Sequence, residues 1–290
     1  MIRRLFWRAL GLGLALVALC VAIAVVRVAP IDVRGLARRP PGRTAMMFER
    51  EREAREQHHY YREFWHWVPL ERISATLRRA VLVAEDDKFF THDGLDWDEI
   101  RISAQRNLRE HRVVRGGSTI TQQLAKNLWL GSSRTPWRKF EEMLLAVRLE
   151  RDLSKRRILE LYLNTIEWGD GIYGVGAASR RYFGVPADAL NARQALLLAC
   201  VIINPRRFSP LDPPPRIEKR VRTIAGRMLR RGQLSAAEYR LAVGEPAPVE
   251  EVAAPDSTRA AEPGEAAGGA AGTDTAATAA GDTTGQAPPE

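Results

Sequence analysis

Glu85 stands where a carboxylate could act as a general acid or base. It ends an apolar run with helical spacing and is followed by Asp86 and by the aromatic pair Phe89 and Phe90. A carboxylate at the end of an apolar helix, beside aromatic rings, is partly desolvated, which raises its pKa and suits it to proton transfer near neutral pH. An ordinary acidic helix end is the alternative, although a carboxylate there opposes the helix dipole.

A second segment, GGSTITQQLAKN at residues 116–127, has the form of an anion-binding turn. Two glycines and two hydroxyl side chains precede a predicted helix start, where backbone N–H groups can face a negative ligand. The lysine does not follow the glycines at the spacing of a nucleotide-binding P-loop, and an ordinary capped helix is the alternative. The side chains that could line an anion site are Ser118, Thr119, Gln122, Gln123, Lys126 and Asn127.

A third segment combines bases with a second carboxylate at residues 134–142. Arg138 and Glu142 are four residues apart, so they share one face of a helix, and Arg134 and Lys139 add two more cations. Three bases beside an acid can bind a pyrophosphate and hold the acid ionised. A surface ion pair between neighbouring turns, which is common and weak, is the alternative.

The elements that must position these side chains are predicted to be helices. Apolar residues recur at helical spacing from about Val68 to Val243, and Ser74 and Ser154 are candidate caps. Long alternating strand patterns are absent, and no internal repeat is visible. The sequence therefore predicts a mostly α fold with one compact domain at residues 68–244.

The N-terminal residues contain a candidate membrane span. Residues 9–26 contain no charged side chain, follow three arginines and end at Arg27. Their length corresponds to about 27 Å of helix, and basic residues before a first span predict a cytoplasmic N-terminus. We expect a cytoplasmic end at 1–8 and an uncleaved signal anchor at 9–29. A cleaved signal peptide is the alternative, because residues 22–24 resemble a cleavage site, although the apolar run continues past them.

Residues 30–67 are expected to connect the span to the body. Interleaved acids and bases predict a polar helix at residues 49–63. No spacing typical of metal ligands accompanies the histidines that follow, so we predict no metal site and favour a membrane interface or the edge of a core. This cluster comprises His58, His59, Tyr60, Tyr61, Trp65, His66 and Trp67.

Charge divides the chain of 290 residues, which has a net charge of +9. Residues 245–290 hold nine acids and one base, a charge of −8, so residues 1–244 carry +17. The C-terminal segment has no aromatic residue and no Leu, Ile or Met, so it is predicted to be a disordered acidic tail. Residues 1–244 are therefore basic enough to suit binding to nucleic acid, an anionic membrane or a phosphorylated substrate.

The two cysteines of the chain are too few for a disulfide framework.

Taken in chain order, these segments resemble the motifs of the family-51 peptidoglycan glycosyltransferases. The first motif reads EDxxFxxHxG, the second GxSTIxQQxxKN with an adjusted glycine spacing, and the third RKxxE. A fourth motif, ending in YLN, and a glycine-rich fifth motif follow. The matches lie at residues 85–94, 117–127, 138–142, 155–164 and 169–184, within a resemblance that spans about 68–208.

The resemblance implies a largely helical, lysozyme-like fold and the polymerisation of lipid II into β-1,4 glycan strands. The donor link is α and the product link β, so one inverting displacement releases undecaprenyl pyrophosphate. The resemblance makes Glu85 the general base and Glu142 a second essential carboxylate, near the pyrophosphate or a metal bound to it. It implies that the diphosphates are bound by Lys126, Arg134, Arg138 and Lys139. It implies that the rest of the cleft is lined by Ser118, Thr119, Gln122, Gln123 and Asn127.

The same resemblance sets expectations about cofactors, partners and location. A divalent cation, Mg²⁺ or Mn²⁺, at the pyrophosphate is the only cofactor considered. The expected partners are lipid II, the growing strand, the membrane, and proteins of cell-wall synthesis or division. The catalytic domain is expected on the periplasmic side of the inner membrane, so nucleic acid is excluded.

Two other functions compete with glycan polymerisation. One is a cell-wall hydrolase of the same broad fold, because paired carboxylates also serve glycoside hydrolysis. The other is a non-catalytic membrane scaffold. The basic residues suited to pyrophosphate favour the transferase. Ser-x-x-Lys and Lys-Thr-Gly motifs are absent from the sequence, so we expect the monofunctional form, without transpeptidase activity.

Overall fold

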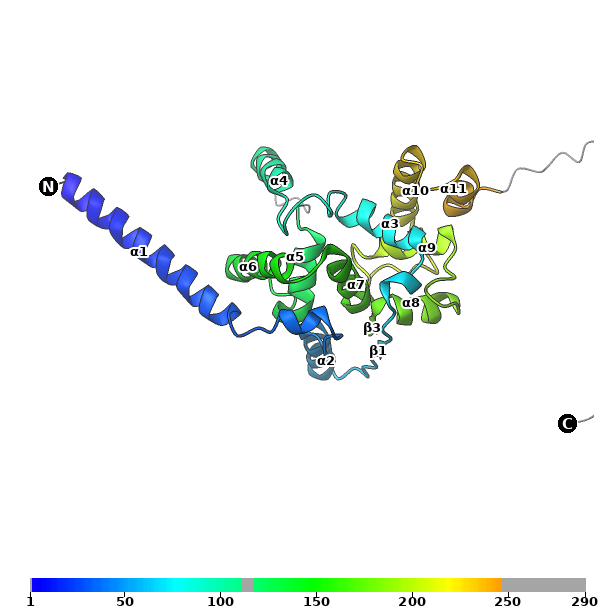
Figure 1. Ribbon diagram of the computed structural model, residues 1–290, viewed down its shortest axis with the longest axis horizontal. Helices are drawn as coiled ribbons and strands as arrows, with labels where there is room; N and C mark the ends of the chain where they lie inside the picture. The colour runs from blue at the N-terminus through cyan, green and yellow to red at the C-terminus, as the bar shows by residue number, and fades with distance from the viewer. Residues whose placement is uncertain (1, 111–116, 247–290) are drawn as a thin grey trace, which may run out of the picture. The chain divides into compact units, whose positions relative to one another are not determined.

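The computed structural model describes residues 2–110 and 117–246, and this part of the chain is mostly helical, as predicted (Figure 1). Gly116 and all but the first two residues of the predicted acidic tail lie outside it. The α-helices are α1 (Ile2–Val28), α2 (Ala45–Glu56), α3 (Ala75–Glu85), α4 (Trp97–Glu110), α5 (Ile120–Ala125), α6 (Pro136–Asp152), α7 (Lys155–Thr165), α8 (Gly174–Phe183), α9 (Ala192–Val201), α10 (Pro215–Arg230) and α11 (Ala236–Val243). Three short helical turns are η1 (Arg34–Ala37), η2 (Leu70–Arg72) and the π-helical η3 (Lys126–Leu130).

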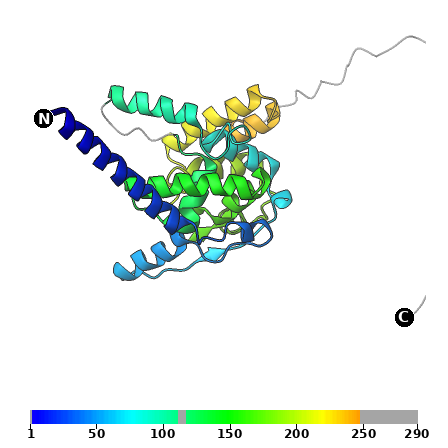
Figure 2. The same cartoon turned by 60° about the vertical axis from the view of Figure 1, so that its left-hand side comes forward.

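The helix α1 fits membrane anchoring. Its segment Phe6–Val28 spans 23 residues and contains an 18-residue stretch with a mean hydropathy of 2.8, so it is long and apolar enough to cross a membrane. Its large apolar side chains are exposed, Leu12 for 74% of its surface, whereas a helix of a soluble core would bury them. The span predicted at residues 9–29 falls on this helix, which Figure 2 shows reaching the helical body at its C-terminal end.

The body packs around the apolar helix α9. Residues 195–201 of this helix are buried, and α3, α10 and α11 pack against it. The helix α5 packs against α6 and α7. The helix α3 places its apolar side chains, including Leu77 and Val81, in this core, so its C-terminal residue Glu85 is held at the edge of the packed helices.

A small sheet completes the body. The strands β1 (Phe64–Trp65), β2 (Glu167–Gly169) and β3 (Ile172–Tyr173) lie in the order β1-β3-β2, with β1 parallel and β2 antiparallel to β3. Strands of two or three residues are too short to produce an alternating pattern in the sequence. Gly174 follows β3 with a φ of +73°, and a Cβ there would lie 2.6 Å from the Asn164 carbonyl oxygen, so only glycine fits.

Residues 30–67 pack into the same compact unit as the body. The predicted helix at 49–63 is wrong in its bounds, because α2 runs from Ala45 to Glu56 and begins at the capping residue Thr44. It ends where His58 adopts a positive φ of 55°. The strand β1 then pairs with β3, so the segment joins the sheet. Among the described residues, no group of three His, Cys, Asp or Glu side chains could hold a metal ion.

Candidate active site

Glu85 lies at the C-terminal end of α3 with two side-chain partners. Its Oε2 accepts a hydrogen bond from Gln123 Nε2 at 3.1 Å, and its Oε1 accepts one from Arg220 Nη2 at 2.9 Å. The side chain is only 13% exposed. Burial raises the pKa of Glu85 above its ordinary value, against the lowering effects of Arg220, Gln123 and Lys126. The structure thus shows the partly desolvated carboxylate with a raised pKa that the apolar helix end predicts, and the role of Glu85 in proton transfer stays a prediction.

The next carboxylate, Asp86, organises the site. Its buried Oδ2 accepts the backbone N–H of Ile120 at 2.9 Å, at the start of α5. His92 Nε2 lies 3.1 Å from both oxygens of Asp86, and the N–H of Gly94 donates to His92 Nδ1. Since Nδ1 accepts, Nε2 is the nitrogen that donates to the carboxylate. Asp86 and His92 thus tie the first motif to the helix of the second.

The helix α5 carries Gln123 toward Glu85. Tyr162 donates its hydroxyl hydrogen to Gln123 Oε1 at 3.0 Å, which fixes the amide so that its nitrogen faces the carboxylate. Tyr162 is buried, and burial raises the pKa of its phenol well above the usual range, so the hydroxyl remains a donor. The chain Tyr162–Gln123–Glu85 holds the carboxylate in one orientation.

Thr119 and Gln122 form the capping box of α5 rather than a ligand surface. The Thr119 hydroxyl accepts the N–H of Gln122, and Gln122 Oε1 accepts the N–H of Thr119. The Thr119 hydroxyl also donates to the Gly94 carbonyl at 2.7 Å. Gln122 is fully buried, and its Nε2 has no partner among the described residues. In this structure the placement of these two residues in the cleft is therefore corrected: they set the start of the helix.

Lys126 and Asn127 lie where α5 passes into the π-helical turn η3. Asn127 is buried and donates to the Gln123 carbonyl, so it stabilises the turn instead of lining the cleft. Burial lowers the pKa of Lys126, Glu142 opposes that effect, and Arg138 adds to it. Because Lys126 also lowers the pKa of Glu85, its ammonium group interacts with both predicted carboxylates. Local π-helix is frequent at functional sites.

Glu142 is surrounded by cations on α6. Its Oε2 accepts from Arg138 Nη1 at 2.6 Å, and its Oε1 accepts from Lys139. Lys139 also donates to the Ser118 hydroxyl at 2.9 Å, which joins the second and third motifs. The side chain of Glu142 is 3% exposed and that of Arg138 14%, so this pair is buried and is not a weak surface ion pair, whereas Lys139 is 39% exposed.

Arg134 stands apart from this cluster. It lies exposed in the loop before α6, which starts at Pro136 with Thr135 as its cap. Arg134 therefore lies outside the group of predicted site residues that the structure brings together. This group comprises Glu85, Ser118, Gln123, Lys126, Arg138, Lys139 and Glu142.

The sequence comparisons identify the family. The family model "Transglycosylase" matches residues 52–229, which is more than half of the chain and includes every predicted site residue. The chain belongs to the transglycosylase family. Proteins named "Biosynthetic peptidoglycan transglycosylase" are similar to it. The one from Laribacter hongkongensis is 46% identical over 188 residues, 65% of this chain and 82% of that protein. The one from Methylobacillus flagellatus is 43% identical over 229 residues, 79% and 97% of the two chains.

The transglycosylase family accounts for the fold as well as the site. The mostly helical architecture agrees with the lysozyme-like fold expected of the family, so that prediction is confirmed. A further relative, from Azoarcus sp., is 51% identical over 162 residues, 56% of this chain and 70% of that protein.

Arg220 is a residue of the transglycosylase site that the sequence analysis missed. It comes from α10, lies 135 residues from Glu85 in the chain, and also donates to the Ala84 carbonyl at 3.0 Å. The helical spacing of apolar residues indicates the helix α10, because Ile217, Val221 and Ile224 form the buried face of that helix. The pattern did not indicate which of its many arginines turns toward α3.

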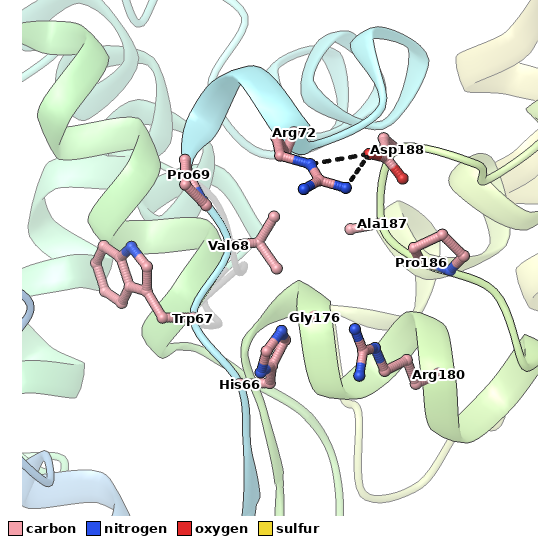
Figure 3. Close-up of a pocket in the computed structure, with 10 residues that line it drawn as sticks. All are labelled: His66, Trp67, Val68, Pro69, Arg72, Gly176, Arg180, Pro186, Ala187 and Asp188. Carbon is pink, nitrogen blue, oxygen red and sulfur yellow. Dashed lines mark hydrogen bonds and ion pairs between the residues drawn. The ribbon is translucent and has the colours of Figure 1, made fainter. Parts of the chain in front are cut away.

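A cavity of about 280 Å³ adjoins Arg220. Its floor contains Val83, Ala84 and Ile217, and four basic side chains of α10 line it, namely Arg216, Lys219, Arg220 and Arg227. A second cavity of about 180 Å³ lies at another place, where Arg72 pairs with Asp188 at 3.1 Å and Arg180 also lines the wall (Figure 3). None of the predicted site residues lines this second cavity.

The oxygens of Glu142 are occupied by side-chain cations, and a divalent cation at the pyrophosphate stays a prediction. Both carboxylate oxygens already accept hydrogen bonds from Arg138 and Lys139. Among the described residues no group of three His, Cys, Asp or Glu side chains could hold a metal ion, so a Mg²⁺ or Mn²⁺ ion at the pyrophosphate would take most of its oxygen ligands from the substrate and water. Protein cations supply the positive charge at this position.

Proposed function

We propose that this transglycosylase polymerises lipid II and that Glu85 is the base that takes the proton of the attacking sugar hydroxyl. Membership of the family makes the chain a peptidoglycan glycosyltransferase of cell-wall synthesis. The observation that carries the role of Glu85 is its environment. The carboxylate is nearly buried, is oriented by Gln123 and Arg220, and has a raised pKa.

The reaction is one displacement at C1 of the donor sugar. The 4-hydroxyl oxygen of the acceptor forms the new bond to C1, its proton passes to Glu85, and the bond from C1 to the pyrophosphate oxygen breaks with its electron pair. Each oxygen of Glu85 accepts one hydrogen bond and keeps a second lone pair for this proton. The glycosidic link changes from α to β, and Glu85 returns the proton to solvent.

The leaving pyrophosphate meets the second half of the site. Lys126, Arg138 and Lys139 carry the positive charge that stabilises the departing oxygens. Glu142 binds the last two of these side chains, and Ser118 holds Lys139 on its other side. Fixed cations need no rearrangement as charge develops, which is the source of electrostatic catalysis.

Membrane anchoring suits substrates that are lipids. The exposed apolar helix α1 supports a single-pass protein. The arginines that precede its apolar segment support a cytoplasmic N-terminus, which would put the catalytic body on the periplasmic side of the inner membrane. Proteins of cell-wall synthesis or division are the partners that such a location favours.

Incubation of the purified full-length protein with lipid II in detergent tests the activity. We expect glycan polymer that lysozyme digests, together with release of undecaprenyl pyrophosphate. Release of fragments from finished sacculi, without polymer from lipid II, would identify a hydrolase instead. If neither product forms, the scaffold function is the one that remains.

A further inference from the structure

We infer that Glu49, on α2, is a positioning residue for the loop at residues 131–135, which joins the turn η3, where Lys126 lies, to the helix α6, which carries Arg138 and Lys139. This role rests on the proposed function, since it concerns the same leaving-group site. Glu49 belongs to the segment expected to be a connector, and it precedes the part of the chain that the family model matches, residues 52–229. Among the described residues, both side-chain hydrogen bonds of Glu49 go to Ser132, so its proposed effect on the site passes through the loop.

Both carboxylate oxygens of Glu49 bind one residue of that loop. Oε2 accepts the backbone N–H of Ser132 at 2.6 Å, and Oε1 accepts the Ser132 hydroxyl at 2.7 Å. The sequence separation is 83 residues, so the contact fixes two distant segments against each other. Two hydrogen bonds from one carboxylate set both the position and the orientation of Ser132.

The backbone beside Ser132 is shaped to receive Glu49. Gly131 has a φ of +71°, and a Cβ built there would lie 2.5 Å from Glu49 Oε2. Glycine is therefore required both for the conformation and for the approach of the carboxylate. The N–H of Gly131 donates to the Lys126 carbonyl at 3.0 Å, which closes the π-helical turn η3. Glu49 thus braces the end of the turn whose first residue is Lys126.

The same contact reaches the cation cluster on the other side. The carbonyl of Ser133, next to Ser132, accepts a hydrogen bond from Arg138 Nε. The guanidinium of Arg138 then donates from Nη1 to Glu142. Glu49 therefore acts on Arg138 through two neighbouring residues. It holds Ser132, and the carbonyl of the adjacent Ser133 orients the Arg138 side chain.

The helix α2 is held firmly enough to serve as a support. Thr44 caps it, and Met46 and Met47 pack with Tyr173 of β3. Arg50 joins it to the sheet through Glu167, at 3.2 Å, and this pair is largely buried. Its position is thus set by the sheet and by its packing against the turn η3.

The test compares three variants for lipid II polymerisation: Glu49→Ala, Glu49→Gln and Glu56→Ala. Glu56 lies on the same helix, is exposed and forms a surface ion pair with Arg52, so Glu56→Ala is the matched control. We expect Glu49→Ala to raise KM for lipid II about tenfold, the effect of losing one or two hydrogen bonds, while the thermal midpoint falls by only about 2 to 4 °C and the protein stays folded at the assay temperature. Glu49→Gln should stay near wild type, because an amide can accept from the Ser132 N–H and donate to its hydroxyl oxygen.

An unchanged KM for Glu49→Ala would overturn the inference, and so would a fall in kcat that merely follows a lower thermal midpoint. A Glu49→Gln variant as impaired as Glu49→Ala would also overturn it, because charge and not hydrogen bonding would then matter. If the wild type fails to polymerise lipid II, the proposed function fails. The inference is then decided by titration with inorganic pyrophosphate, which Glu49→Ala should bind about tenfold more weakly than wild type and Glu56→Ala equally well. Equal binding by all variants would overturn it.

Discussion

At the scale of single residues, opposing effects set the chemistry of Glu85. Burial favours the protonated acid, whereas the Arg220 guanidinium and the hydrogen bond from Gln123 favour the carboxylate, and burial prevails. A base with a raised pKa accepts a proton more readily once ionised. The cost is that the enzyme loses its base as the pH falls through that raised pKa.

Arg220→Gln should move the acidic limb of the pH profile of kcat/KM to higher pH. The substitution removes the cation that opposes burial, so the pKa of Glu85 rises further and less carboxylate is present at a given pH. Activity at pH 6 should fall by about tenfold more than activity at pH 8. Arg222→Gln, at an exposed position of the same helix, is the control. Superimposable profiles for wild type and Arg220→Gln would refute the role given to Arg220.

At the scale of elements, short helices hold the site because their starts are fixed from outside. The helix α5 has six residues, too few to be stable alone, yet it carries Gln123. Asp86 accepts the N–H of Ile120, and the Thr119 hydroxyl donates to Gly94. Asp86 and Gly94 of the first motif therefore support the start of α5.

Asp86→Ala should lower the free energy of unfolding by about 3 kcal/mol, because it leaves His92 and the Ile120 N–H buried without their acceptor. Denaturant unfolding in detergent measures this loss. Asp93→Ala, which removes an exposed carboxylate in the same loop, should stay within about 0.5 kcal/mol of wild type. Equal stability of the two variants would contradict the support role.

The local elements of the site could be predicted from sequence, and its long-range contacts could not. The end of α3 at Glu85 and the pairing of Arg138 with Glu142 follow from apolar periodicity and helical spacing. Arg220 reaches Glu85 only because α10 packs near α3, which no local pattern encodes. Gln122 looked like a ligand residue because it is polar, but its partner is the backbone of its own helix start.

At the scale of the whole molecule, the anchor and the catalytic body are joined at the cation-bearing helix. Arg27, at the end of α1, lies 2.9 Å from Glu141 of α6, which neighbours Glu142. Arg148, further along α6, donates to the carbonyls of Val28 and Ile31. The last turn of the apolar helix is therefore fixed to the element that carries Arg138 and Lys139.

Membrane attachment should depend on α1 and not on the basic body alone. Full-length protein should remain with phospholipid vesicles in flotation at about 1 M salt, where the Debye length is about 3 Å and surface attraction is screened. A variant without residues 2–28 should bind only anionic vesicles and dissociate at that salt concentration. Release of the full-length protein by salt would show that α1 does not insert.

The measurement that tests the central claim most directly is kcat/KM for lipid II polymerisation by Glu85→Gln across the pH range. The amide keeps the shape of the side chain but cannot take the hydroxyl proton. We predict a loss of about 10²- to 10⁴-fold, the usual contribution of a general base, with no acidic limb in the residual activity. Activity within a few-fold of wild type, or an unchanged acidic limb, would contradict the assignment of Glu85 as the base.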